Sequence, residues 1–289
     1  MLWPYSGKLK IKMKVNLLGV RGSVPTTGPE TRGYGGQTSC ILVSEDGSQL
    51  ILDAGTGIQT LGTRSKTNRI DILLTHLHLD HIQGLGFFKP LFDSDAEVHI
   101  WGPSSNTNSL RSRLGRYLSP PLFPVNLQEI PCRLEMHEIG NTDFEIDSFK
   151  VKSTYVIHPG PTLGFRITGK NSVFTYIPDH EPALGMHGMI KDNAWISGFE
   201  IAHQADLLYH DGQYTETEYD TRKGWGHSSI KDALLFAHTT STSHILIGHH
   251  DPNRSDGQLD DFSIDLLKNA KQLNVNAEFA VEKNEYTLR

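Results

Sequence analysis

The chain has 289 residues, and 27 lysine and arginine residues against 33 aspartate and glutamate residues give a formal net charge of −6. This acidic balance argues against stable nucleic-acid binding, because such proteins need positive charge to neutralise phosphates. The hydrophobic fraction is 37%, and no apolar run approaches the roughly eighteen residues of a membrane helix, so we predict a soluble protein without a membrane partner.

The cysteines and the N-terminus favour a cytoplasmic protein. Cys40 and Cys132 are too few for a disulfide framework and lack the spacing of zinc motifs, although a disulfide between them stays open. The N-terminus has lysines but no apolar segment of the kind found in secretion signals. Met13 offers an alternative start, so we interpret residues 1–12 as a possible dispensable extension of a single domain spanning 1–289.

Short apolar segments between turn residues predict strands along the whole chain. They are expected at 14–19, 38–44, 49–53, 70–75, 97–101, twice within 144–157, and at 162–168, 172–177, 206–209, 244–248, 278–282 and 286–288. The Asp46-Gly47 pair predicts a tight hairpin turn between the second and third strands. Helices are expected at 58–61, 83–90, 108–118, 228–238 and 260–273. This order of elements indicates two sheets packed face to face with helices outside.

A histidine-rich loop follows the predicted strand 70–75. Within six residues it holds His76, His78, Asp80 and His81. Such groups are costly to bury without partners, whereas neutral imidazole and carboxylate are natural ligands of divalent metals. In an extended chain His76 and His78 point to the same side, and the following turn can reach a second point. We therefore predict ligands for two metal ions; the alternative is a solvated histidine loop.

Three further metal-binding side chains also follow predicted strands. His158, Asp179 and His249 each come directly after a β-rich run. Loops at strand ends often carry functional groups because the scaffold holds them rigidly. His250 beside His249 leaves the choice of ligand between these two open, and we favour His249.

These motifs resemble the metallo-β-lactamase superfamily over essentially the whole chain. Residues 19–25 and 38–40 resemble N-terminal loops of its phosphodiesterase branch. Residues 209–214 and 226–229 resemble the paired histidine motifs of tRNase Z-like phosphodiesterases, with Asp211 where that branch often has glutamate. The resemblance implies an α+β fold, a four-layer αββα sandwich, and a binuclear metal-dependent hydrolase.

The resemblance also implies a ligand set. It assigns His76, His78 and His158 to one ion, Asp80, His81 and His249 to the other, and Asp179 to both. Zn²⁺ is the expected ion, and Mn²⁺ or Fe also suit nitrogen and oxygen ligands. A metal-activated hydroxide would then attack phosphorus, and Asp80 counts among the catalytic residues.

Other residues are expected to act around the ions. His227 would protonate the leaving alkoxide, with Asp211 holding its ring and raising its pKa; the alternative for His227 is a helix cap. Arg21 is a candidate phosphate contact, for which solvent exposure is an equal explanation. His180 is expected either to contact substrate or to support a ligand. Asp53 is expected to orient a ligand imidazole.

The substrate follows from a departure from the tRNase Z pattern. Those enzymes carry a long tRNA-gripping arm between the third metal histidine and the bridging aspartate, and residues 158–179 have room only for a hairpin. We therefore predict hydrolysis of a small phosphodiester, with a 3′,5′-cyclic nucleotide as leading candidate. The alternatives are tRNA 3′-end processing and hydrolysis of a lactone or other acyl substrate.

Further expectations concern alternative functions and possible partners. An oxygen-reducing di-iron protein usually has glutamate where this chain has His78. A non-enzymatic metal scaffold is the least favoured alternative because all seven ligand types are present. Arg111, Arg113 and Arg116 are interpreted as a solvated helix face. A homodimer is compatible with the sequence, but nothing in it requires one.

Overall fold

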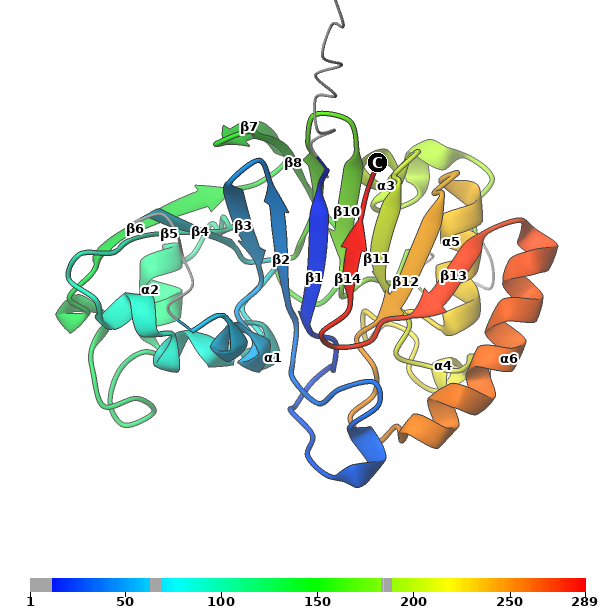
Figure 1. Ribbon diagram of the computed structural model, residues 1–289, viewed down its shortest axis with the longest axis horizontal. Helices are drawn as coiled ribbons and strands as arrows, with labels where there is room; N and C mark the ends of the chain where they lie inside the picture. The colour runs from blue at the N-terminus through cyan, green and yellow to red at the C-terminus, as the bar shows by residue number, and fades with distance from the viewer. Residues whose placement is uncertain (1–11, 63–68, 183, 185–188) are drawn as a thin grey trace, which may run out of the picture.

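Two mixed β-sheets face each other at the centre of the computed structural model, which describes residues 12–62, 69–182, 184 and 189–289 (Figure 1). The first sheet has the order β14-β1-β2-β3-β4-β5-β6 and the second has the order β13-β12-β11-β10-β9-β8-β7. The strands of the first sheet are β1 (Lys14–Gly19), β2 (Cys40–Glu45), β3 (Ser48–Leu52), β4 (Arg69–Leu73), β5 (Glu97–Pro103), β6 (Arg133–Ile139) and β14 (Glu285–Thr287). Those of the second are β7 (Thr142–Ile146), β8 (Phe149–Tyr155), β9 (Leu163–Thr168), β10 (Val173–Ile177), β11 (Leu207–Asp211), β12 (His244–Gly248) and β13 (Asn276–Phe279).

Each sheet is antiparallel at one end and parallel at the other. Strand β14 and strands β1 to β3 pair antiparallel, and β3 to β6 pair parallel. The second sheet repeats this arrangement, with β7 to β10 antiparallel and β10 to β13 parallel. The carboxyl ends of neighbouring parallel strands share one edge, so the loops after β10, β11 and β12 lie together.

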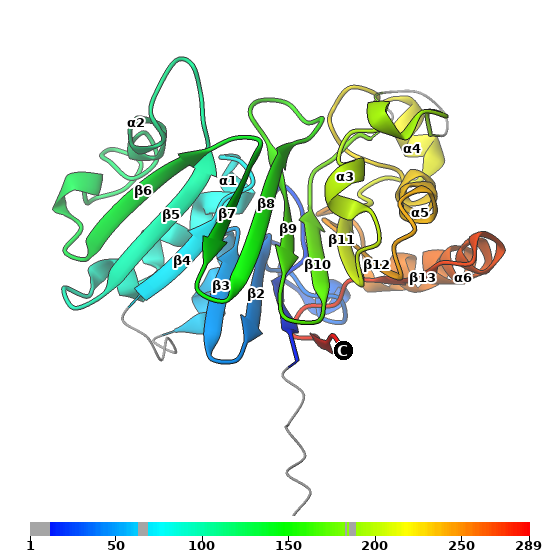
Figure 2. The ribbon, with the colours of Figure 1, turned by 90° about the horizontal axis from the view of Figure 1, so that it is seen from above.

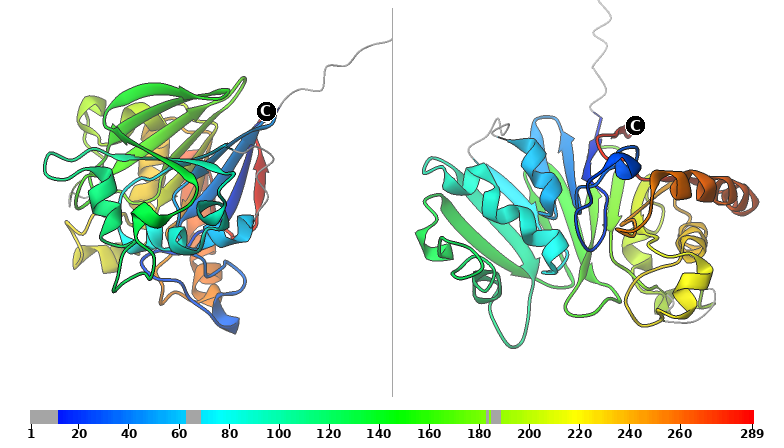
Figure 3. Two further views of the ribbon diagram at one scale, coloured as in Figure 1. Left: turned by 90° about the vertical axis from the view of Figure 1, so that its left-hand side faces the viewer. Right: turned by 90° about the horizontal axis from the view of Figure 1, so that it is seen from below.

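Helices cover the outer faces of both sheets, which completes four layers (Figures 2 and 3). The α-helices are α1 (Leu79–Ile82), α2 (Leu110–Gly115), α3 (Phe199–Ala202), α4 (Glu216–Asp220), α5 (Ile230–Thr239) and α6 (Asp256–Leu273). The 3₁₀ turns are η1 (Pro29–Thr31), η2 (Thr56–Leu61), η3 (Gln83–Phe87), η4 (Lys89–Phe92), η5 (Leu127–Glu129) and η6 (Asn193–Trp195).

Alternating side chains supply three apolar layers. The inner faces of the sheets pack against each other through residues such as Leu17, Phe165 and Tyr176, which have no exposed surface. The outer face of the second sheet packs on α5 and α6, where Leu234 and Leu266 are buried. Burial of this extent, at roughly 25 cal/mol per Å² of apolar surface, holds the site loops on a rigid base.

Most expected elements are present, and local chemistry explains the differences. The hairpin β2–β3 turns at Asp46 and Gly47, which both have positive φ as a primed turn requires. Helix α6 begins earlier than expected because Ser255 and Gln258 form a capping box. The expected helix 83–90 is wrong; this segment, with two glycines and a proline, forms the 3₁₀ turns η3 and η4 instead.

Several remaining expectations can be placed on the structure. Cys40 and Cys132 are buried free thiols, so the disulfide that the sequence left open is not formed. Of the possible extension 1–12, only Lys12 lies within the described residues. Among the described helices, none combines the length and the apolarity needed to cross a lipid bilayer.

Candidate metal centre

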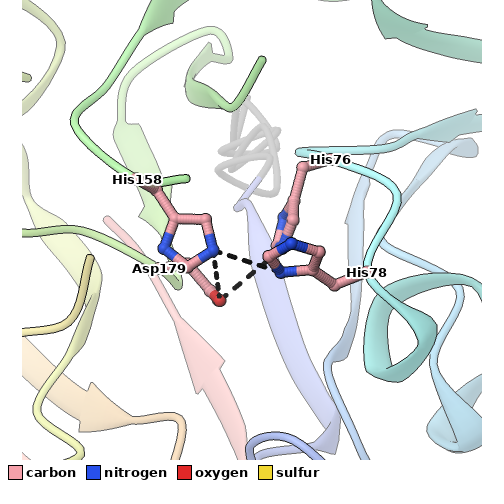
Figure 4. A group of neighbouring side chains, drawn as sticks. All are labelled: His76, His78, His158 and Asp179. Carbon is pink, nitrogen blue, oxygen red and sulfur yellow. Dashed lines mark hydrogen bonds and ion pairs between the residues drawn. The ribbon is translucent and has the colours of Figure 1, made fainter. Parts of the chain in front are cut away.

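The seven predicted metal-binding side chains meet at one edge of the paired sheets. His76 and His78 follow β4, His158 follows β8, and Asp179 follows β10 (Figure 4). The side chains form two groups, each with ligand atoms within 4.8 Å of one another: His76, His78, His158 and Asp179 in the first, and Asp80, His81 and His249 in the second. The structure thus brings the seven predicted ligand side chains close together.

The Asp179 carboxylate stands between the two groups. Its Oδ2 lies 3.7 Å from His76 Nε2 and 3.6 Å from His158 Nε2. Its Oδ1 lies 3.1 Å from His81 Nε2 and 3.2 Å from His249 Nδ1. One carboxylate oxygen therefore faces each group, which is the arrangement a bridging ligand needs.

Unpartnered atoms show that the centre fits divalent cations. Four buried polar atoms of the centre have no hydrogen-bond partner among the described residues: His76 Nε2, His81 Nε2, Asp179 Oδ1 and His249 Nδ1. Each such atom costs about 1–3 kcal/mol if it stays unsatisfied. Burial and the neighbouring His81 hold the pKa of His76 well below its usual range, which keeps the imidazole neutral and free to bind a metal. A set of nitrogen and oxygen donors suits Zn²⁺, Mn²⁺ or Fe.

Asp53 contacts His81, one of the predicted ligands. Its Oδ2 lies 2.8 Å from His81 Nδ1, so the opposite ring nitrogen points into the centre. The Tyr176 hydroxyl donates to the same oxygen at 2.9 Å, and the Thr75 backbone N–H donates to Oδ1 at 2.7 Å. Asp53 is fully buried, so these contacts fix its carboxylate.

Glu181 anchors the loop that contacts His158, a second predicted ligand, and no role was predicted for Glu181 from the sequence. Its buried carboxylate accepts the backbone N–H groups of Gly224 and Gly226, each at 2.9 Å, and the Tyr219 hydroxyl at 2.8 Å. The Gly226 carbonyl in turn lies 2.8 Å from His158 Nδ1. The only local signal for this role is an acidic residue two positions after the predicted ligand Asp179.

Geometry separates His249 from His250. His249 belongs to the second group, whereas His250 Nε2 lies 2.8 Å from the Ala280 carbonyl, outside the metal centre. His249 has a φ of 55°, a left-handed conformation that is uncommon for residues other than glycine. Gly22 allows the loop to pack on this ring, because a Cβ there would lie 2.5 Å from His249 Cδ2.

Asp211 and His227 form a pair directly beside the metal centre. Asp211 ends β11, is fully buried, and its Oδ2 lies 2.6 Å from His227 Nδ1. Burial lowers the pKa of His227, but the charge of Asp211 and the hydrogen bond to it outweigh burial and raise the pKa to about 9. The His227 ring centroid lies 5.0 Å from those of His158 and His249. Its alternative role as a helix cap is wrong, because Ser229 caps α5.

Comparison with known proteins fits this geometry. The family model described as "Beta-lactamase superfamily domain" matches residues 49–250. The chain belongs to this family. Ribonuclease Z of Haloferax volcanii is 23% identical over 83% of this chain and 84% of that protein.

Solved structures show the same fold. The metallo-β-lactamase fold protein YhfI from Bacillus subtilis is 17% identical and superposes with a TM-score of 0.69, covering 96% of this chain and 100% of that one. The short form of human tRNase Z is 20% identical, with a TM-score of 0.66 over 96% and 99% of the two chains. The predicted superfamily and four-layer fold are thereby confirmed, and this β-lactamase-superfamily protein is a metal-dependent hydrolase.

The structure does not place Arg21 against a substrate in this β-lactamase-superfamily protein. The guanidinium is fully buried and donates to the Gly35 carbonyl at 2.8 Å, the Arg254 carbonyl at 3.0 Å and the Asp251 carbonyl at 3.1 Å. Because every one of these acceptors is a loop carbonyl, Arg21 ties two loops together. The expected phosphate contact is therefore wrong.

His180 is also removed from any substrate. The side chain is fully buried, its Nδ1 lies 2.9 Å from His210 Nε2, and its ring packs on Phe236 of α5. Its backbone N–H donates to Asp211 Oδ2 at 3.2 Å. Of the two expected roles, contact with substrate is thus wrong, and the residue supports the carboxylate that holds His227.

Proposed function

We propose that this hydrolase cleaves phosphodiester bonds of RNA in the manner of ribonuclease Z. The observation that carries the proposal is the buried Asp211–His227 pair, 2.6 Å apart, beside the two groups of metal ligands. The curated relatives named ribonuclease Z support RNA as substrate over the cyclic nucleotide that the sequence favoured. An acyl hydrolase would have less use for a proton donor placed outside its metal ligands.

The proposed function assigns each metal ion to a set of residues. His76, His78 and His158 would hold one ion, Asp80, His81 and His249 the other, and Asp179 both, with Zn²⁺ as the proposed metal. Ions bound there would supply Lewis acidity for a phosphoryl oxygen and lower the pKa of a bound water.

The chain itself supplies the leaving-group chemistry. His227, hydrogen-bonded through Nδ1 to Asp211, offers its other ring nitrogen toward the reacting phosphate. As the bond from phosphorus to the leaving oxygen breaks, that nitrogen donates a proton and prevents a free alkoxide. Asp211 keeps the imidazole protonated and in one orientation, and Gln213 N–H fixes the other carboxylate oxygen at 2.9 Å.

A second candidate is a small phosphodiester, which one observation favours. Between His158 and Asp179 the chain forms only the β9–β10 hairpin, with residues 169–172 at its turn. No long arm is inserted there to grip a folded RNA, and the net charge of −6 gives no general attraction for one.

The test is turnover by the metal-loaded protein, with the metals quantified in the same sample. It would be offered a precursor tRNA with a 3′ trailer, a linear dinucleotide, a 3′,5′-cyclic nucleotide and bis(p-nitrophenyl) phosphate. Cleavage of the precursor at one position supports the proposal, and cleavage of the small diesters alone supports the second candidate. Metal binding without turnover of any diester would overturn both.

The variant Asp211→Asn tests the role of the Asp211–His227 pair. It should lower kcat about 10²-fold while the metal content stays that of the wild type, because the pair acts on the leaving group. Asp206→Asn is the matched control: Asp206 lies just before the same strand at its opposite end, and its carboxylate accepts the Val173 N–H at 2.7 Å. Equal kcat for Asp211→Asn and Asp206→Asn would contradict the assigned role.

A further inference from the structure

A groove leads from the first group of metal ligands to helix α2. Its volume is about 440 Å³, and His76 and His78 form its inner end. Arg113, Arg116 and Tyr117 line it on the side of α2 and the following turn. Arg113 and Arg116 thus line the groove, whereas Arg111 lies outside it.

The three arginines differ in the hydrogen bonds that their side chains make within the protein. Arg113 donates to the Pro103 carbonyl and Arg111 to the Leu134 carbonyl at 3.2 Å. Arg116 is exposed, and within the described part of the chain its side chain makes no hydrogen bond or ion pair. An unengaged guanidinium in the wall of a groove is well suited to bind a phosphate, because it offers several donors in one plane.

Two apolar residues of the groove are open to solvent. Leu79 is 60% exposed and Leu122 is 71% exposed, and both line the groove. Tyr117 is held in place by its hydroxyl, which donates to the Gln83 carbonyl at 2.7 Å. Apolar side chains next to a free cation match the two parts of a nucleotide, its base or ribose and its phosphate.

We propose that this groove is a subsite for the nucleotide next to the scissile phosphate. Arg116 binds the phosphate of that nucleotide, and Leu79 and Leu122 contact its base or ribose. The groove is continuous with the metal centre at His76 and His78, so a chain whose phosphate is held there extends directly into it. The inference rests on the proposed function, because only a substrate with more than one phosphodiester reaches Arg116.

The test measures binding separately from turnover. Fluorescence anisotropy would follow a labelled uridine trinucleotide, UpUpU, and the dinucleotide UpU on metal-loaded protein carrying Asp211→Asn, so that cleavage is slow. In this background Arg116→Ala should weaken binding of the trinucleotide about tenfold and reduce its preference over the dinucleotide, because one charge-assisted contact is lost. The salt dependence of trinucleotide binding should fall by about one counterion.

Arg111→Ala is the matched control, since it removes the same charge from α2, five residues earlier and outside the groove. It should leave both affinities at their starting values. Equal effects of Arg116→Ala and Arg111→Ala, or no effect of either, would overturn the subsite. If binding depends on Arg116 but the wild type does not cleave RNA, the subsite is supported and the proposed function is rejected. If the wild type cleaves RNA but Arg116→Ala and Arg111→Ala bind alike, the proposed function is supported and the subsite is rejected.

Discussion

The contact between Gly22 and His249 shows how closely single residues define the metal centre. A side chain at position 22 would overlap the His249 ring, and the ring cannot retreat freely because the backbone N–H of His249 is bound to the Tyr209 hydroxyl at 3.1 Å. The ligand position thus depends on the absence of a side chain in a loop far away in sequence.

Gly22→Ala should therefore displace His249 and empty the second metal position. We expect the metal content to fall from about two ions per chain toward one, measured by elemental analysis of protein dialysed against a trace of metal. Gly257→Ala in α6 is the control, since a Cβ there meets nothing within 4 Å. Full metal content in Gly22→Ala would show that the ring can move without losing its ion.

Functional residues could be predicted from the sequence where neighbouring residues alone indicate their role. The candidate ligands between His76 and His81 could be predicted from their spacing, and Asp53 from its position after a strand. Arg21 and His180 were placed wrongly because burial depends on partners such as Gly35 and Phe236 that are distant in sequence. The role of Glu181 was not predicted for the same reason, because its carboxylate accepts the N–H groups of the 224–226 loop only when that loop is folded over it.

At the scale of elements, the loop between α4 and α5 is fixed by one carboxylate. Glu181 accepts from Gly224, Gly226 and Tyr219, and the Gly226 carbonyl then orients His158. A loop without regular structure needs such an anchor, because its buried N–H groups have no strand partner. The anchor also links the loop directly to the first group of metal ligands.

Glu181→Ala should destabilise the protein by about 2–4 kcal/mol, because it leaves buried donors unsatisfied. It should also weaken metal binding at least tenfold through His158. Urea unfolding and a metal titration measure the two effects, and Glu181→Gln should restore part of each by keeping one acceptor oxygen. Glu216→Ala removes a carboxylate from an exposed pair with Lys231 and should cost under about 1 kcal/mol. Similar losses for the two alanine variants would contradict the anchor.

The elements themselves could largely be predicted because buried strands carry apolar runs. Strand β6 was missed since its sequence Arg133–Ile139 mixes charged and apolar residues at the edge of the sheet, where little of it is buried. Helices α3 and α4 are single turns of four and five residues, too short for a periodic signal.

Across the whole molecule, the metal centre joins the two sheets. His76 and His78 extend from the first sheet, whereas His158 and Asp179 extend from the second. Without cations, the unpartnered ring nitrogens and the carboxylates would face each other across this junction at a cost in free energy. Metal bound there would therefore contribute to folding as well as to chemistry.

Removal of metal should lower the melting temperature by roughly 5–10 °C, the shift expected for a ligand that binds only the folded state well above its Kd. Thermal unfolding with and without a chelator measures the change. In His76→Ala the chelator should have a clearly smaller effect, because one ligand is already missing. Identical melting curves for the wild type under both conditions would show that the ions do not stabilise the junction.

The pairing of β14 with β1 has a consequence for how the protein is made. Lys14 and Glu285 form an ion pair across 271 positions of sequence, and the two strands share backbone hydrogen bonds. During synthesis at the ribosome, β1 can pair with β2 early, but its other edge stays open until β14 has emerged. A growing polypeptide with such an unpaired edge is prone to associate with its neighbours, so nascent chains are expected to depend on chaperones until β14 is available for pairing.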